Sequence, residues 1–173
     1  RWVARQKPTA IAMNMDASEA PSLTRDEQLE VVRVSVEVLQ GLPLVSGLIA
    51  GSTADAVGWG NALKNAGAQA LAVFPPFPTF LGNPVPTEMI YRFHKEIGDG
   101  VGLPLIAFQF PKAWGPDFPP DCLAALVQIP QLVGLKEASF DTTKTIETIA
   151  AAKALPRKLG IMTGSDTFIL EAM

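Results

Sequence analysis

The sequence contains a single cysteine, Cys122, and this scarcity limits the chemistry that the chain can support. One thiol forms no disulfide within the chain and holds no metal cluster that needs several cysteines. The residue usage therefore fits a reducing, cytoplasmic setting, and we expect neither a metal nor an organic cofactor.

Positive charge is also sparse, because 14 lysines and arginines stand against 17 acidic residues, for a formal net charge of −3. With no basic block, neither a nucleic-acid backbone nor an anionic membrane surface is an expected partner. No apolar run approaches the roughly 18 residues of a membrane span, and residues 1–5 lack the form of a signal peptide. We expect a protein that binds neither nucleic acid nor membrane.

The glycine motifs of nucleotide-binding proteins are missing as well. The nearest candidate, residues 47–52, has the wrong spacing for a dinucleotide-binding turn, and no phosphate loop occurs. There is no tandem repeat and no low-complexity linker. The 173 residues, 48% hydrophobic and 18% charged, have the composition of one globular domain.

What is present is an alternation of short apolar runs with stretches that can form helices. The six runs lie at residues 9–15, 42–50, 69–77, 103–110, 132–138 and 158–164. Their starts are about thirty residues apart, close to the length of one βα unit in a barrel of eight units. The alternation predicts a parallel α/β sheet, but it fits an open doubly wound sheet as well as a barrel.

Residues that begin and end helices lie between these runs. Thr24 and Glu27 form a capping box before the first helix, and Gly41 is expected to end it. Further helices are expected at residues 53–66, 87–98, 120–128 and 142–154, each ending close to glycine or proline.

The fifth apolar run ends on a lysine, Lys136. Side chains alternate across a strand, so Leu132, Gly134 and Lys136 are expected on one face. If that face lines a barrel, Gly134 leaves room for the lysine stem, and apolar surroundings favour the free amine, the nucleophile of imine formation. The alternative is a lysine that reaches solvent, as lysines usually do.

Five segments of the chain, in order, resemble one known family. Residues 133–139, Val-Gly-Leu-Lys-Glu-Ala-Ser, resemble the Schiff-base motif G-[IL]-K-[ED]-[AS]-S of the dihydrodipicolinate synthase and N-acetylneuraminate lyase family. Residues 15–23 resemble the family loop G-T-T-G-E, 72–77 the strand end P-Y-Y, 103–111 the strand ending Y-N-x-P, and 164–166 the G-x-D turn. The resemblance implies a (β/α)8 barrel, of which this chain holds about six βα units. It also implies a class I lyase or aldolase and assembly as a homo-oligomer, either a dimer or a tetramer.

The same resemblance assigns roles to individual residues. Lys136 is implied to form the imine with pyruvate or another 2-oxo acid. The substrate site is implied to include eight further residues: Asp16, Ala17, Phe77, Phe108, Lys112, Trp114, Gly164 and Asp166.

Several positions depart from the family pattern. Phe108 stands where the family has a tyrosine that relays protons. Asp16 and Ala17 stand where the family's threonines help to hold the pyruvate carboxylate and complete the proton relay. The second tyrosine of P-Y-Y is matched by Phe77, and an arginine that binds a second carboxylate is matched by Ala113. These departures argue against the lysine-pathway synthase and favour a lyase with a less polar second substrate.

Two alternatives remain open. One is a paralogue that has lost the proton relay and serves as a binding or structural subunit, and the other is a dehydratase acting on a sugar acid. Pyruvate itself is expected to bind weakly unless backbone N–H groups or Lys112 replace the missing hydroxyls.

Residues 1–173 are expected to form a single partial barrel domain. Both ends fall within expected helices, and the family's first and last barrel strands and C-terminal helices have no match in the chain. We therefore expect a longer parent chain, with the six strands forming an open arc.

Overall fold

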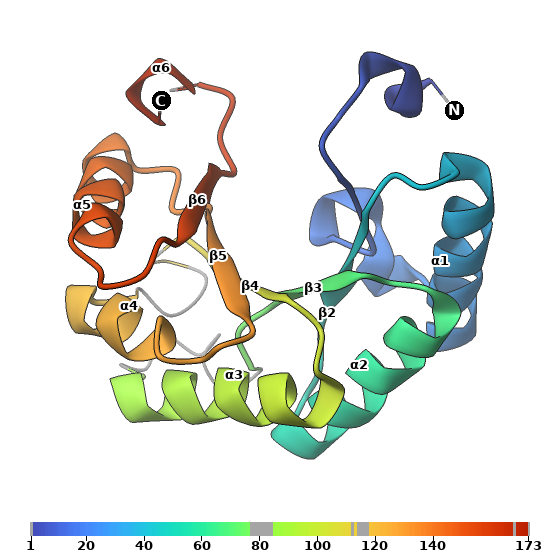
Figure 1. Cartoon of the computed structure of the whole chain (residues 1–173), viewed down its shortest axis with the longest axis horizontal. Helices are drawn as coiled ribbons and strands as arrows, with labels where there is room; N and C mark the ends of the chain where they lie inside the picture. Colours follow the sequence, from blue (N-terminus) through green and yellow to red (C-terminus); the bar gives the residue numbers. More distant parts are fainter. Residues whose placement is uncertain (1, 77–84, 112, 114–117, 168, 173) are drawn as a thin grey trace.

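The computed structural model describes residues 2–76, 85–111, 113, 118–167 and 169–172, in which strands and helices alternate (Figure 1). Six parallel strands form one sheet in chain order, and all six predicted strands are confirmed within narrower bounds. They are β1 Ile11–Met13, β2 Leu44–Leu48, β3 Ala70–Val73, β4 Leu105–Gln109, β5 Leu132–Glu137 and β6 Gly160–Thr163.

The helices follow the strands in turn. The α-helices are α1 Arg25–Leu39, α2 Thr53–Ala66, α3 Thr87–Val101, α4 Pro120–Leu126, α5 Thr142–Lys153 and α6 Ile169–Ala172. Three short 3-10 helices, η1 Val3–Gln6, η2 Asp16–Ser18 and η3 Ala20–Ser22, lie before α1. The predicted capping box is present, with the Thr24 backbone N–H donating to Glu27 Oε2 at 2.8 Å and the Glu27 N–H to Thr24 Oγ1 at 3.3 Å.

Helix α3 is longer than predicted, because the glycines expected to end it at residue 98 lie inside it. It ends only at Gly102, which has a φ of 73°. A Cβ at Gly100 would come within 2.7 Å of Val57 Cγ1, and one at Gly98 within 3.1 Å of Gln131 Oε1. These glycines therefore serve close packing of α3 against its neighbours.

The sheet is a half-barrel. Figure 1 shows the strands as an arc with helices α1 to α5 along its outer side, which settles the choice between a barrel and a doubly wound sheet in favour of the barrel. In the described part of the chain, β1 and β6 are the two edges of the sheet and do not pair with each other. The expected open arc of six strands is therefore confirmed.

Two apolar clusters lie on the two faces of this sheet. The larger one fills the layer between the sheet and the helices and includes the fully buried Leu48, Leu71, Leu105 and Leu135. The smaller cluster lies on the concave face and comprises Met15, Ala72, Phe74, Phe108, Phe110 and Ala138.

The predicted alternation along β5 is wrong at one residue. Leu132 pairs with Leu105, but the next pair is Gly134 with Ile106, so that Val133 is an extra residue in β5. Such a bulge interrupts the alternation of side chains between the two faces. Leu132 consequently packs with Leu135 in the helix-covered cluster, while Lys136 lies on the concave face.

Candidate active site

Lys136 lies near the carboxyl end of β5, paired with Phe108 of β4 on one side and with Met162 of β6 on the other. Its side chain is half-buried in a hollow of about 280 Å³ on the concave face. The other lining residues are Ala10, Ala12, Met15, Val45, Ala72, Ile106, Met162 and Thr163. In barrel enzymes the active site lies at this end of the strands.

Burial lowers the pKa of Lys136 from its usual value, and the nearby carboxylate of Asp16 raises it in part. A lowered pKa leaves more of the lysine as free amine near neutral pH, and only the free amine attacks a carbonyl carbon. The surroundings of Lys136 are therefore closer to those of a nucleophile than to those of a solvated surface lysine.

Phe108 lies beside Lys136 and packs against two further phenylalanines, Phe74 and Phe110. The Lys136 Nζ lies 4.5 Å from the ring centroid of Phe108, within the range of a cation–π contact. The Phe108 ring stacks on Phe74 with centroids 4.4 Å apart, and Phe110 lies 4.8 Å from Phe108. Phe108 is thus held against the amine, but its ring offers no hydroxyl group.

No tyrosine of this chain can supply that hydroxyl. Tyr91 is the chain's single tyrosine, and it lies on α3, where it packs against the helix-covered cluster on the other face of the sheet.

Asp16 and Ala17 lie in η2, directly beyond the carboxyl end of β1. Burial raises the pKa of Asp16, and the positive charge of Lys136 lowers it in part. The structure thus brings Asp16 and Lys136 into one electrostatic environment. Both Asp16 and Ala17 remain exposed to solvent, so the burial that raises the pKa of Asp16 is only partial.

The segment before η2 is fixed by a buried asparagine. Asn14 has a φ of 55° and donates from Nδ2 to Ser46 Oγ at 3.1 Å and to the Gln28 carbonyl at 3.2 Å. A Cβ at Gly47 would lie 2.0 Å from the Asn14 carbonyl oxygen. Glycine at position 47 therefore allows β2 to approach the chain that carries Asp16, a role that the sequence does not indicate.

Glu137, the residue after Lys136, anchors the end of β5 from the opposite face. Its buried carboxylate accepts from Gln109 Nε2 at 3.0 Å, from the Ser139 N–H at 2.9 Å, and from the hydroxyl of Thr145 in α5. These bonds tie β4, β5 and α5 together directly behind the lysine. The acidic residue of the motif was visible in the sequence, but the hydrogen-bond partners of Glu137 could not be predicted from it.

The space next to Lys136 differs from the expectation in one respect. A Cβ at Gly134 would come within 2.8 Å of Met162 Cε and 2.9 Å of the Gly160 carbonyl oxygen. The room that Gly134 leaves is therefore taken by Met162 and by the neighbouring strand, rather than by the stem of Lys136.

Gly164 lies beside the end of β5, where its N–H donates to the Glu137 carbonyl at 2.7 Å. A Cβ there would be 2.8 Å from Ala138 Cβ, so a larger residue would push the two strand ends apart. Asp166 follows two residues later and is exposed. The remaining candidates Phe77, Lys112 and Trp114 lie outside the described residues.

Other features of the described residues suggest no separate chemistry. None of their acidic, histidine and cysteine side chains form a group of three that could hold a metal ion. Cys122 is buried, and burial raises the pKa of its thiol to about 12, which marks a packing residue rather than a nucleophile. Among the same residues, no helix is long and apolar enough to cross a membrane.

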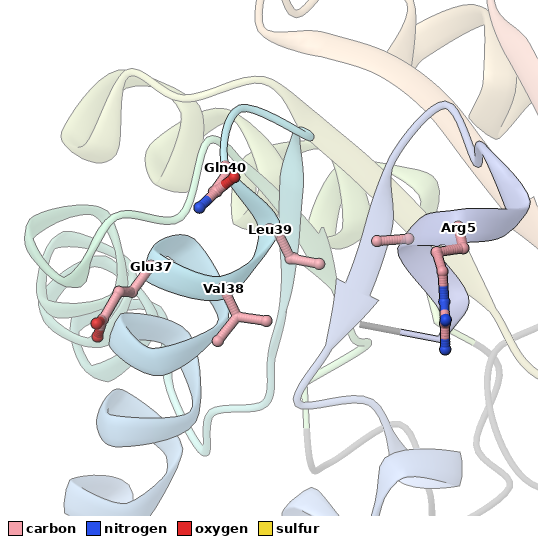
Figure 2. Close-up of a pocket in the computed structure, with 6 residues that line it drawn as sticks. Arg5, Glu37, Val38, Leu39 and Gln40 are labelled. Carbon is pink, nitrogen blue, oxygen red and sulfur yellow. The ribbon is translucent and has the colours of Figure 1, made fainter.

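A second hollow lies between η1 and the last turn of α1 (Figure 2). It is lined by Ala4 and Arg5 from η1 and by residues 37–40 at the end of α1. Because α1 returns from the carboxyl end of β1 toward the start of β2, its last turn lies at the end of the sheet opposite Lys136. This hollow is therefore separate from the candidate active site.

Comparisons with known proteins agree on one group of relatives. Residues 8–173 match the model of the Dihydrodipicolinate synthetase family. A 4-hydroxy-tetrahydrodipicolinate synthase of Dechloromonas aromatica is 31% identical over 159 residues, which cover 91% of this chain and 52% of the relative. The enzyme of the same name from Thiobacillus denitrificans is 28% identical over 174 residues, covering 99% of this chain and 56% of the relative.

Solved structures give the same picture. The chloride-inhibited dihydrodipicolinate synthase of Acinetobacter baumannii, complexed with pyruvate, superposes with a TM-score of 0.86 at 29% identity. The match covers 99% of this chain and 57% of that structure. The chain thus spans about half the length of the curated relatives it matches.

Proposed function

Since this chain belongs to the dihydrodipicolinate synthetase family, we propose that the protein is a class I lyase or aldolase that acts on pyruvate or another 2-oxo acid. Lys136 is the residue that forms the imine. The observation that carries the proposal is the position of this amine, half-buried in an apolar hollow at the carboxyl end of β5 with a lowered pKa. A solved relative complexed with pyruvate supports the substrate class.

The imine makes the chemistry possible. Attack of the Lys136 amine on the ketone and loss of water give a protonated imine, which withdraws electrons from the adjacent carbon. A carbon–carbon bond at that carbon can then break or form. Carbon–oxygen cleavage, as in a sugar-acid dehydratase, follows the same logic and belongs to the same proposal.

We propose further that the substrate differs from that of the lysine-pathway synthase, although the relatives carry that name. Asp16 places negative charge where a substrate carboxylate would be held by hydroxyls, and the ring of Phe108 lies over the amine. The largely aliphatic lining of the hollow and the phenylalanine cluster on the same face of the sheet favour a second substrate with little polar surface. By family membership the protein would be a homo-oligomer, which size-exclusion chromatography with light scattering can test.

A second candidate function is that of a paralogue with impaired catalysis that serves as a binding or structural subunit. The observation that favours it is Phe108 itself, which contacts Lys136 but carries no group that could relay a proton.

Covalent capture separates the two candidates. The purified protein is incubated with a panel of 2-oxo acids and borohydride, and its peptides are then weighed by mass spectrometry. The expected result is the mass of the reduced acid on the peptide that contains Lys136. Lys136→Ala should abolish this adduct, while Lys153→Ala, which removes an exposed lysine at the end of α5, should leave it unchanged. A panel that leaves Lys136 unmodified would contradict the lyase proposal and favour the impaired paralogue.

A further inference from the structure

We propose that Asp16 is the general acid–base of this site and that its carboxyl group transfers protons to and from the adduct on Lys136. This inference rests on the proposed function, because it needs an imine at Lys136. It assigns to the first residue of η2 the proton transfers for which Phe108 has no suitable group.

The first support is the position of Asp16 in the fold. Met15, immediately before it, lines the same hollow as Lys136 and belongs to the same apolar cluster as Phe108. Asp16 begins η2 beyond the carboxyl end of β1, one residue after the lining residue Met15, and its charge interacts with that of Lys136. Ser18 stabilises this turn by accepting from the Met15 N–H at 2.8 Å.

The second support is that Thr163 is the one other polar residue among the described residues that line the hollow with Lys136. Its hydroxyl, however, donates to the Ser165 carbonyl at 3.3 Å and accepts from the Ser165 N–H at 3.1 Å. Glu137 faces the helices and is held there by three hydrogen bonds. Tyr91 and His94 both lie on α3, outside the barrel interior.

The ionisation of the pair agrees with this role. Burial moves the pKa of Asp16 upward and that of Lys136 downward, so both shift toward neutral pH. Among the described residues, the charges that act on these two groups are those of Asp16 and Lys136 themselves. A catalytic acid–base works best when its pKa lies near the working pH, because both protonation states are then populated.

The proton transfers balance as follows. The amine of Lys136 adds to the ketone carbon, and a proton moves from nitrogen to oxygen to give a carbinolamine. Asp16 in its acid form donates a proton to the carbinolamine hydroxyl, which leaves as water, and the protonated imine remains beside the Asp16 carboxylate. The carboxylate then removes a proton from the adjacent carbon, giving the enamine and restoring the acid form of Asp16.

This last step can be measured apart from complete turnover. Pyruvate and 2-oxobutanoate are incubated with the protein in D₂O, and exchange of their C3 protons is followed by NMR. We expect Asp16→Asn to lower the exchange rate by about 10²–10⁴-fold, the usual contribution of a positioned acid–base. The rise of the rate with pH through the ionisation of Asp16 should also disappear. Equilibrium capture by borohydride should persist, since Lys136 is intact.

Two variants control for structural effects. Glu19→Gln removes another exposed carboxylate from the same loop and should leave the exchange rate close to that of the unaltered chain. Asp16→Glu keeps the acid and should restore part of the exchange lost in Asp16→Asn. Circular dichroism checks that each variant is folded.

The outcomes distinguish this inference from the proposed function. Capture at Lys136 together with unaltered exchange in Asp16→Asn would overturn the role of Asp16 and leave the lyase proposal standing. Loss of exchange in Glu19→Gln as severe as in Asp16→Asn would also overturn it, as an effect of the loop. If the unaltered protein shows neither capture nor exchange, the proposed function itself fails.

Discussion

The two faces of the half-barrel contain different kinds of side chains. The face toward the helices holds a continuous cluster of mostly aliphatic residues, many of them fully buried. The concave face holds a smaller, aromatic cluster next to a half-buried lysine. Because neighbouring residues in a strand point to opposite faces, Leu135 and Lys136 belong to different environments although they are adjacent in sequence. We infer that the first face carries most of the stability and the second carries the chemistry.

The contrast also appears in two basic groups whose pKa values are both lowered by burial. His94 lies completely buried in α3, with its ring edge-on to Phe93 and Phe118. Its Nδ1 meets the Ile90 carbonyl at 2.7 Å, while its Nε2 has no hydrogen-bond partner among the described residues. Lys136 is only half-buried and opens into a hollow. Burial therefore keeps the first group neutral and enclosed, whereas under the proposed function it prepares the second for reaction.

The largest expected effect comes from Lys136→Met, which removes the amine and keeps an unbranched apolar stem. Covalent capture of 2-oxo acids should vanish completely, because none of the other described residues that line the hollow carries an amine. The free energy of unfolding should stay within roughly 1 kcal/mol of the original, since the residue is only half-buried. Mass spectrometry and urea titration measure the two quantities. A large loss of stability would show that the concave face supports the fold as well.

The complementary change is Leu135→Ala on the other face. It should lower the free energy of unfolding by about 2–5 kcal/mol, because it leaves a cavity in a fully buried aliphatic cluster. Urea titration measures the loss, and at a temperature where the variant stays folded, Lys136 should still be captured. A Leu135→Ala variant with the stability of the unaltered chain, or a folded one without capture, would break the proposed division between the two faces.

A third prediction concerns the pH dependence of stability. Burial lowers the pKa of His94 to about 4, against an ordinary value of 6.5, although the Ile90 carbonyl raises it in part. Between these values the unfolded chain binds a proton that the folded chain excludes. The stabilising contribution is therefore complete above pH 6.5 and is lost as the pH falls toward 4, by about 3 kcal/mol in total.

His94→Leu tests this, because leucine cannot titrate. The difference in free energy of unfolding between the variant and the unaltered chain should change steadily between pH 6.5 and 4. A difference that stays constant over this range would mean that His94 is protonated inside the fold or already exposed.

The smallest expected effect is that of Phe108→Tyr. If Asp16 transfers the protons, a new phenol beside Lys136 should raise turnover less than about tenfold, which corresponds to less than about 1.4 kcal/mol of activation free energy. Steady-state kinetics with the acid that gives the best capture would measure it. A rise of roughly a hundredfold or more would identify the missing phenol as the main defect and would weaken the role assigned to Asp16.

The sequence predicted the repeating elements of this fold well, because strands, caps and glycine stops are local patterns. The position of Lys136 was also predictable, because its motif is short and lies at the end of an apolar strand. The bulge at Val133 was not, since it depends on the pairing of β5 with β4. Likewise, the sequence showed Gly47 only as part of a glycine pattern with the wrong spacing for nucleotide binding. The need for glycine at this position comes from the close approach of the Asn14 backbone in the folded chain.

The candidate site follows the same division. The sequence identified Asp16 as a residue that disfavours a substrate carboxylate. Its charge interaction with Lys136 could not be predicted, because it depends on how the fold places the end of β1 relative to β5. The bonds of Glu137 to Gln109 and Thr145 join three elements and have no local signature. Residue positions within one strand could be predicted from the sequence, whereas contacts between residues of different strands could not.

The packing of Met162 against Gly134 has a consequence for how this site can evolve. Met162 lines the hollow beside the lysine, and its flexible thioether side chain occupies the room that Gly134 leaves on the neighbouring strand. Methionine adapts its shape easily and tolerates replacement. A single mutation at position 162 can therefore deepen or fill the site without moving the backbone that presents Lys136. Under the proposed function, relatives that differ at this position would admit carbonyl compounds of different sizes while the amine of Lys136 stayed in place.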